Sequence, residues 1–321
     1  MEKKKSKETD NNEANEPKYY AAIDIGSNAA RLLIKRLEKD ANGAPVLTKE
    51  LLLRYPLRLG MDAFSEGKIS KEKARKTMML MKSYSKLLEL YGVERYRACA
   101  TSAMRDSSNA KKLIERIKSK AGIKIEILEG QEEAKIVYEN HFECLEDRRG
   151  NYMYVDVGGG STEVNLLVDG ELVYTRSFDI GTIRVLTGGV SNEAWQRMCE
   201  EIQDKTANLD TINIIGLGGN INKLFKLAET KDKDLKRLPI ESLRETYDKL
   251  SKLTKEERMQ QFGLKSDRAD VIEPAGCIFL TIADVVKADY VYVPCIGIAD
   301  GIIDSMVAKD LASVETSIET C

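Results

Sequence analysis

Two stretches of the chain share one pattern, and this repeat constrains the fold more than any other feature of the sequence. They read "AAIDIGSNAARLLIKR" near the start and "MYVDVGGGSTEVNLLV" near the middle. Each is an apolar strand that ends in an aspartate, a glycine turn with small polar residues, and a second strand. Strands alternate with helical patterns after both copies. The repeat therefore predicts two similar α/β domains that face each other across a cleft.

The composition agrees with a globular protein and limits the partners. Hydrophobic residues make up 42% of the 321 positions, enough for two cores, and the formal net charge is only -2. A general nucleic-acid binder is usually basic, so we expect no nucleic-acid partner, and any polyanion must meet a local basic cluster. No apolar run approaches the ~20 residues of a membrane helix, so no membrane contact is expected.

The cysteines indicate the redox compartment. All six are scattered, none forms a C-x-x-C pair, and no signal peptide is visible. This usage predicts reduced thiols and a cytoplasmic protein. The single histidine, His141, has no neighbours that would make it a catalytic base, so any proton transfer is expected from carboxylates.

The pattern along the chain predicts the domain boundaries. Residues 1–17 form a polar tail, 18–138 a first domain, and 139–302 a second domain. A last helix over 303–321 is expected to return to the first domain. Locally, Ser70 should cap a helix that Gly92 ends, and Asp169 with Gly170 should form a hairpin turn.

Three glycine loops are candidates for phosphate binding, because bare amides at a strand end can point at an anion. Two of them are the matched turns of the repeat, and the third joins a strand to a helix. Ordinary turns are the alternative interpretation for any one loop alone. The candidate residues are Gly26, Ser27 and Asn28; Gly158, Gly159, Gly160, Ser161 and Thr162; and Gly218, Gly219 and Asn220.

Acidic residues beside these loops suggest two roles. Asp24 and Asp156 repel phosphate directly, but they can hold a divalent cation or a water molecule next to it. Glu132 and Glu133 follow a glycine turn and open a helix. Their carboxylates either favour the helix dipole or accept a proton in the cleft, and the residues alone leave both interpretations open.

Two arginines are weaker candidates. Arg105 follows Thr101 and Ser102 in "ATSAMRDSSN", and Arg58 lies in "LRLG". A guanidinium matches phosphate oxygens in pairs, although most surface arginines do nothing of the kind. The segment 268–273, "RADVIE", has the composition of an ordinary charged helix start, and a place at the domain seam is the alternative interpretation.

Taken together, these motifs resemble a known family. "AAIDIGSN", "LRLG", "ATSAMRDSSN", "EILEGQEEA", "VDVGGGSTEV", "FDIGTIRVL", "GLGGNINKL" and "RADVI" occur in the order seen in exopolyphosphatase and guanosine pentaphosphate (Ppx/GppA) phosphohydrolases. The resemblance covers about residues 19–305. It implies an α/β fold of two ribonuclease-H-like domains around a central cleft, as in the superfamily of actin, sugar kinases and heat-shock chaperones.

The resemblance also implies residue roles and an activity. Glu133 would be the general base, Arg105 would also be catalytic, and Arg58 would bind phosphate. Asp156 and Glu163 would hold Mg²⁺ or another divalent cation, with Asp24 added as a ligand by its own position beside the first loop. Asp156 and Glu163 would also act in catalysis. The reaction would be metal-dependent hydrolysis of the terminal phosphoanhydride of polyphosphate. Family members often form homodimers, so a homodimer is the oligomer that the resemblance implies.

Several alternatives stay open at this point. A guanosine pentaphosphate hydrolase would use the same chemistry, transfer to ADP would use similar binding groups, and a sensor would keep the loops without turnover. Ala29 and Ala299 stand where relatives often carry a hydroxyl and an arginine, and both departures bear on substrate preference. The length of polyphosphate that such an enzyme would prefer also stays open at this point.

Overall fold

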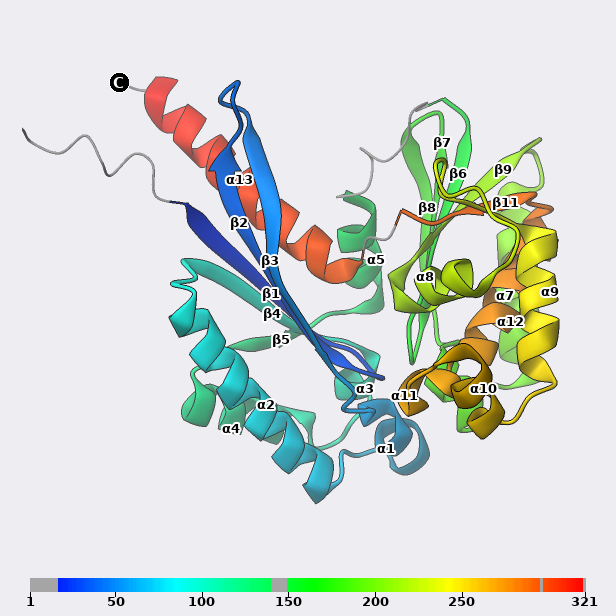
Figure 1. Cartoon of the computed structure of the whole chain (residues 1–321), viewed down its shortest axis with the longest axis horizontal. Coiled ribbons are helices and arrows are strands. Elements are labelled where there is room, and N and C mark those ends of the chain that lie inside the picture. Colours follow the sequence, from blue (N-terminus) through cyan, green and yellow to red (C-terminus); the bar gives the residue numbers. More distant parts are fainter. Residues whose placement is uncertain (1–16, 140–148, 295–296, 320–321) are drawn as a thin grey trace, which may run out of the picture.

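Each copy of the repeat begins a mixed β-sheet. Five strands of the second sheet, β8-β7-β6-β9-β11, follow the arrangement of the first sheet, and β10 is an additional edge strand. The computed structural model describes residues 17–139, 149–294 and 297–319 (Figure 1). His141, Cys144, Cys295, Cys321 and residues 1–16 of the expected tail lie outside the described residues. The first sheet has the order β3-β2-β1-β4-β5, and the second has the order β10-β11-β9-β6-β7-β8.

Both sheets combine antiparallel hairpins with parallel crossovers. In the first, β1 pairs antiparallel with β2 and parallel with β4, and in the second β6 pairs in the same way with β7 and β9. The strands are β1 Lys18–Ile25, β2 Ala30–Lys39, β3 Pro45–Tyr55, β4 Arg95–Ala100, β5 Ile125–Ile127, β6 Asn151–Val157, β7 Thr162–Val168, β8 Glu171–Phe178, β9 Ile212–Leu217, β10 Arg237–Pro239 and β11 Tyr290–Tyr292.

Helices pack on each sheet and complete two lobes (Figure 1). The first lobe carries α1 Leu59–Glu66, α2 Lys71–Leu90, α3 Ser102–Arg105 and α4 Ala110–Ala121, whereas α5 Gly130–Glu139 follows β5 but packs on β7 and β8 of the second sheet. The second lobe carries α6 Thr182–Leu186, α7 Asn192–Thr206, α8 Gly218–Leu227, α9 Ile240–Ser251, α10 Lys255–Phe262, α11 Ser266–Ala269 and α12 Ile272–Val286. These elements have the actin-like ATPase fold, which confirms the predicted fold class.

Local signals in the sequence set several of these boundaries. The Ser70 side chain accepts a hydrogen bond from the Lys73 amide at the start of α2, and Gly92 follows the helix end with φ 59°. Asp169 and Gly170 both have positive φ in the turn between β7 and β8. That is the geometry of a tight hairpin turn that matches the twist of its strands.

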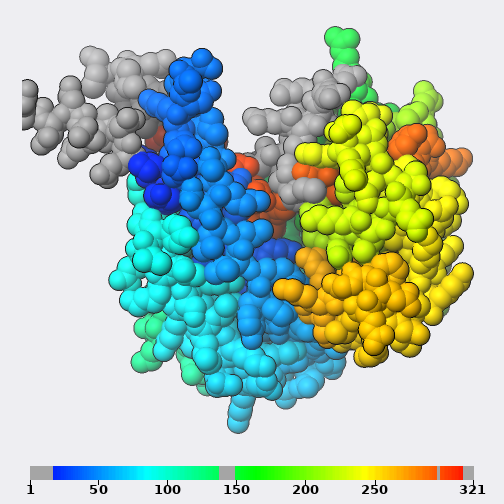
Figure 2. Space-filling model, in the orientation of Figure 1, coloured from blue at the N-terminus to red at the C-terminus, as the bar shows by residue number. Residues whose placement is uncertain are grey.

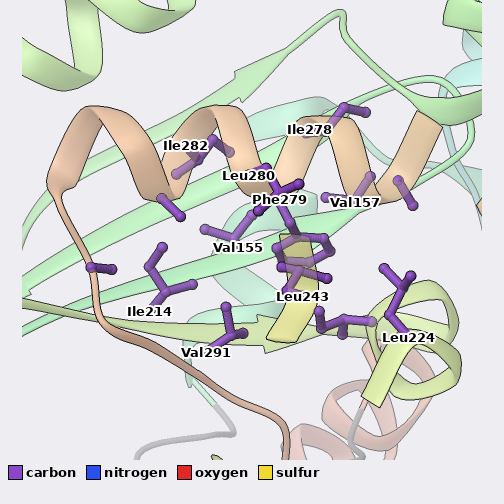
Figure 3. Close-up of a cluster of buried hydrophobic side chains, with 14 of the residues drawn as sticks. Val155, Val157, Ile214, Leu224, Leu243, Ile278, Phe279, Leu280, Ile282 and Val291 are labelled. Atoms are coloured by element: carbon purple, nitrogen blue, oxygen red, sulfur yellow. The ribbon is translucent and has the colours of Figure 1, made fainter. Parts of the chain in front are cut away.

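Separate apolar cores stabilise the two lobes. In the second, α12 lays a buried face across the sheet, and Phe279 packs among Val155, Ile214 and Val291 (Figure 3). In the first, α2 and α4 cover the sheet, with Met81 and Ile117 fully buried.

The last helix, α13 Ile298–Glu319, contacts the first sheet. It packs against β1, β2, β4 and α5, and Ile302 and Ile303 lie in a third core cluster that also contains residues of the second sheet. The helix begins five residues before the expected range because Ile298 and Ala299 are buried in the same cluster. The cluster therefore joins the lobes behind the cleft.

The structure also bears on the cysteines and on membrane-spanning helices. Cys99, Cys199 and Cys277 are free thiols, as the scattered spacing predicts. Within the described ranges, every helix is too short or too polar to cross a lipid bilayer.

Candidate active site

A deep cleft separates the two lobes and has a volume of about 540 Å³. Figure 2 shows the molecule hollowed between β3 on one side and α8 with α10 and α11 on the other. All three glycine loops line this cleft, although they come from distant parts of the chain. The two lobes therefore face each other across one cleft, as the repeat predicts.

The first loop is held rigidly beside the second lobe. The Gly60 amide donates to the Ser27 carbonyl across 2.8 Å, and the Ser27 and Ser102 hydroxyls are 2.9 Å apart. The Asn28 side-chain amide donates to the Asp267 carbonyl across 3.1 Å, which ties the loop to α11. Gly26, Ser27 and Asn28 all line the cleft.

The second loop turns tightly and touches the first. Its Gly158 amide donates to the Ser161 carbonyl across 2.9 Å, and a Cβ on Gly159 would lie 2.8 Å from the Cβ of Ser27. Glycine is therefore required there by close approach of the two loops. Gly158, Gly159 and Ser161 line the cleft.

Two predicted members of the second loop have structural partners instead. Thr162 donates its hydroxyl to the Ile180 carbonyl across 2.6 Å and is fully buried. A Cβ on Gly160 would meet the Phe64 ring at 2.4 Å. Neither residue lines the cleft, because both pack the loop against neighbouring elements.

The third loop combines a strand end with the start of α8. Gly218 has φ 84° and lies against Asp156, where a Cβ would come within 2.5 Å of Oδ1. The Asn220 side-chain amide donates to the Val157 carbonyl across 3.3 Å. Gly218, Gly219 and Asn220 all line the cleft, as predicted.

The four predicted carboxylates also line the cleft. Asp24 is buried and accepts a hydrogen bond from the Arg31 guanidinium at 2.7 Å, directly across the β1–β2 hairpin. Glu163 lies opposite Asp156 in the β6–β7 pairing and accepts a hydrogen bond from the Ser177 hydroxyl at 2.8 Å. The repeat thus places an ion pair, Asp24 with Arg31, in the first lobe, and two carboxylates, Asp156 and Glu163, opposite each other in the second.

Glu133 differs from Asp24 and Glu163, whose carboxylates accept hydrogen bonds from neighbouring side chains. It stands in the first turn of α5, and its Oε2 atom is enclosed without a hydrogen-bond partner. An unpaired buried carboxylate oxygen is costly unless a ligand or water completes it. This atom is therefore free to accept a proton or a hydrogen bond from something bound in the cleft.

Burial and mutual repulsion raise the pKa of three of the carboxyl groups. The pKa of Glu133 lies well above its ordinary value because of burial, then because Glu163, Asp24 and Asp156 are negative. Burial, followed by the charge of Asp156, raises the pKa of Glu163 to about 7. Burial also raises the pKa of Asp156 to about 6, against the opposing charge of Arg31. Groups that resist ionisation in a cleft are characteristic of catalytic sites.

Basic side chains from both lobes form a second part of the cleft wall. Arg268 is the most unusual, because burial and the positive charges of Arg54 and Arg31 lower its pKa to about 10. It donates a hydrogen bond to the Gly219 carbonyl but makes no ion pair within the described chain. A buried cation beside other cations is stabilised by a bound anion. The remaining basic residues of this wall are Lys49, Lys223, Lys226 and Lys265.

The seam at α11 is a feature that the sequence pattern underestimated. Arg54 lies 2.6 Å from Asp267, and Arg58 lies 2.6 Å from Asp270, so two ion pairs connect β3 and α1 to α11. The segment 268–273 therefore does more than start a helix. The two ion pairs join residues that are more than 200 positions apart, so the sequence near α11 does not show them.

Two predicted substrate arginines point elsewhere. The guanidinium of Arg58 is engaged by Asp270 and does not line the cleft. Arg105 donates to the Leu128 carbonyl across 2.9 Å and lines a second, smaller cavity. Its positive charge still lowers the pKa values of Glu133 and Glu163, so it lies near the carboxylates without facing the cleft.

The described carboxylates would hold a divalent cation only if a bound phosphate supplied the rest of its ligands. No group of three acidic, histidine or cysteine side chains in the described chain forms a metal cage by itself, and Asp24 is already paired with Arg31. Mg²⁺ is usually held by one or two carboxylates together with phosphate oxygens. The raised pKa values of Asp156 and Glu163 are those of carboxylates that a positive ion would stabilise.

Two α/β lobes that meet at a cleft lined by glycine loops and carboxylates are the arrangement expected of a protein that binds phosphate. Residues 41–310 match the model of the Ppx/GppA phosphatase family. The chain belongs to this family.

Individual relatives agree with this placement. The structure is similar to that of the Ppx/GppA family member of Aquifex aeolicus, with 27% identity, a TM-score of 0.71, and coverage of 92% of this chain and 99% of that one. Exopolyphosphatase 2 of Mycobacterium tuberculosis is 28% identical over 78% of this chain and 86% of its own. The guanosine-5'-triphosphate,3'-diphosphate pyrophosphatase of Photobacterium profundum is 25% identical over 90% of this chain and 59% of its own. The chain spans about half the length of the first curated relatives it matches.

Proposed function

We propose that this phosphatase hydrolyses the terminal phosphoanhydride of inorganic polyphosphate and releases orthophosphate, with Glu133 as the general base. The observation that carries the proposal is the enclosed, unpartnered Oε2 atom of Glu133 among other acids. A raised pKa keeps such a carboxylate basic enough to take a proton from water near neutral pH. The exopolyphosphatase relative supports this choice of substrate class.

The cleft supplies the groups that the reaction needs. Amides of the three glycine loops and the buried guanidinium of Arg268 would bind the phosphate oxygens. The attacking water would give its proton to Glu133 as its oxygen bonds to the terminal phosphorus, and the bridging P–O bond would break. Lysines of the basic wall, such as Lys223 and Lys226, would offset the charge of the departing chain.

A divalent cation would neutralise further negative charge at the phosphate when bound, and Mg²⁺ suits this role because it prefers carboxylate and phosphate oxygens. Asp156 and Glu163 would hold it, because Asp24 is occupied by Arg31. In the chain itself, Asp24 would then position Arg31 at the loop. The hydrogen bond from Ser177 would fix the orientation of the Glu163 carboxylate.

Guanosine pentaphosphate is the second candidate substrate. It also carries a terminal phosphoanhydride bond, and the relative from Photobacterium profundum is named as a pyrophosphatase of this nucleotide. In the structure, Leu52 on β3 is half exposed at the edge of the cleft and offers an apolar surface for a base. Polyphosphate has no such group, so this contact would favour the nucleotide.

The test is phosphate release from both substrates in parallel. Purified protein with Mg²⁺ is given short-chain polyphosphate and guanosine pentaphosphate at equal concentration, and orthophosphate is measured over time. Faster release from polyphosphate supports the proposal, and faster release from the nucleotide favours the second candidate. Tight binding with no release from either would indicate a sensor, and release only when ADP is added would indicate a phosphotransferase.

A further inference from the structure

A second cavity adjoins the candidate catalytic carboxylates, apart from the cleft. Its volume is about 240 Å³, enough for an orthophosphate ion with several waters. It opens between α3, the start of α5 and β8. Its lining includes Arg105, Asp106, Gln131, Arg176, Ser177 and Asp179.

Only a thin wall separates the two spaces. Ser177 lines the second cavity and Glu163 lines the cleft. The Ser177 hydroxyl donates a hydrogen bond of 2.8 Å to the Glu163 carboxylate. Glu163 and Ser177 face each other in the β7–β8 pairing, so the wall here is one pair of side chains. Beside them, Arg105 lines the cavity and influences the pKa values of both glutamates across the wall.

The charges of the second cavity suit an anion. Its two acids are held by one guanidinium, since Arg184 lies 2.6 Å from Asp106 and 3.4 Å from Asp179. Arg105 is 3.9 Å from Asp106 and binds only a carbonyl closely. Arg176 lies 3.5 Å from Glu201, and its side chain is half exposed. Arg105 is therefore the lining arginine with the most distant carboxylate partner, because Arg184 lies closer to Asp106, and its guanidinium can meet an anion in the cavity.

The proposed reaction creates a need for such a space. The terminal phosphate would lie innermost, at Glu133 and Glu163, while the shortened chain still fills the cleft toward solvent. Orthophosphate leaving through the cleft would have to pass that chain. We propose, on the basis of the proposed function, that the second cavity is the exit for orthophosphate, with Arg105 and Arg176 guiding the ion outward.

An exit of this kind lets the enzyme keep its substrate between cleavages. The shortened chain advances by one phosphate while the product leaves on the other side of Ser177. Blocking the exit would force the chain to dissociate first, so products of intermediate length would accumulate. Release of orthophosphate would then lag behind its formation.

The experiment compares bond cleavage with product release in three variants of the full chain. Arg176→Glu reverses a charge in the exit, Gln131→Trp fills it, and Arg197→Glu makes the same charge change on the exposed face of α7. Acid quenching measures orthophosphate formed in the first turnover, and a fluorescent phosphate sensor measures orthophosphate released. Gel electrophoresis of long-chain polyphosphate measures the intermediate lengths.

The expected result is specific to the two exit variants. Cleavage in the first turnover should stay near the wild-type rate, while release slows by about ten-fold, the effect of roughly one and a half kcal/mol of added electrostatic or steric barrier. Intermediate chain lengths should appear only in these variants. Release that keeps pace with cleavage in both Arg176→Glu and Gln131→Trp would overturn the exit. Absence of any cleavage in the quenched wild-type reaction would instead refute the proposed function, and the exit with it.

Discussion

The guanidinium of Arg58 lies 2.6 Å from the carboxylate of Asp270, and this ion pair connects the two lobes beside the cleft. Both side chains are mostly buried, and Arg58 holds a left-handed backbone conformation with φ 52° to reach its partner. A non-glycine residue seldom adopts that conformation without a compensating contact. The pair therefore sets how closely the lobes approach, although Arg58 itself does not face the cleft.

Breaking this pair should weaken substrate binding. Asp270→Asn is expected to raise KM by about three- to ten-fold with a smaller effect on kcat, because one lobe contact worth roughly 1 kcal/mol is lost. Steady-state kinetics measures both constants. Asp284→Asn, which removes an exposed ion pair with Arg244, is the control. An unchanged KM in Asp270→Asn would show that the pair does not govern closure.

Replacing Arg268 should affect binding and stability in opposite directions. Arg268→Gln removes a charge-assisted phosphate contact, so KM should rise by about ten- to a hundred-fold. It also removes a buried cation that has no ion-pair partner in the described chain, so the substrate-free protein should unfold at a higher temperature. Kinetics and thermal unfolding together test this. A lower melting temperature with an unchanged KM would make Arg268 structural.

Neutralising Asp156 should stabilise the protein in a pH-dependent way. Its pKa is about 6 in the folded chain against an ordinary 3.8, so the folded state resists losing this proton. Its contribution to stability is therefore lost as pH rises from about 4 to about 6. In metal-free buffer with chelator, Asp156→Asn should gain about 2 to 4 °C in Tm at pH 8 and less at pH 5. A variant less stable than wild type at pH 8 would contradict the assignment.

Separating the two phosphate loops should reduce catalysis. In Gly159→Ala, the new methyl group would meet the Cβ of Ser27 at 2.8 Å and the Asn28 amide nitrogen at 3.2 Å. The loops must move apart, and small displacements of phosphate ligands cost about ten- to a hundred-fold in kcat/KM. Gly297→Ala, at a cleft position with nothing within 4 Å, is the matched control. Equal activity in both variants would mean that loop spacing is unimportant.

The sequence anticipated those parts of the structure that local signals determine. The strand–aspartate–glycine repeat predicted two related sheets, which share an arrangement of five strands, and Ser70, Asp169 and Gly170 shape the elements as expected. The glycine loops, Asp24 and Asp156 could be named from their places at strand ends, whereas Glu133 and Glu163 were assigned only through the resemblance to the family.

The remaining site residues depend on distant partners. Nothing near Arg268 in the sequence shows that it packs on Gly219 or lies among other arginines. Arg58 and Arg105 were placed by motif, and their guanidinium groups are instead engaged by Asp270 and the Leu128 carbonyl. The domain boundaries, the metal and the homodimer stay predictions.

Replacing the Glu133 carboxylate with an amide tests whether this residue is the general base. Orthophosphate formation from polyphosphate with Mg²⁺ is measured for wild type, Glu133→Gln and Glu132→Gln, with substrate binding measured in parallel. Glu132 is the matched control because it is exposed and paired with Arg97 at 2.9 Å. We predict a loss of about two to four decades in turnover for Glu133→Gln with binding retained, and near-normal turnover for Glu132→Gln. Near-normal turnover in Glu133→Gln would contradict the account.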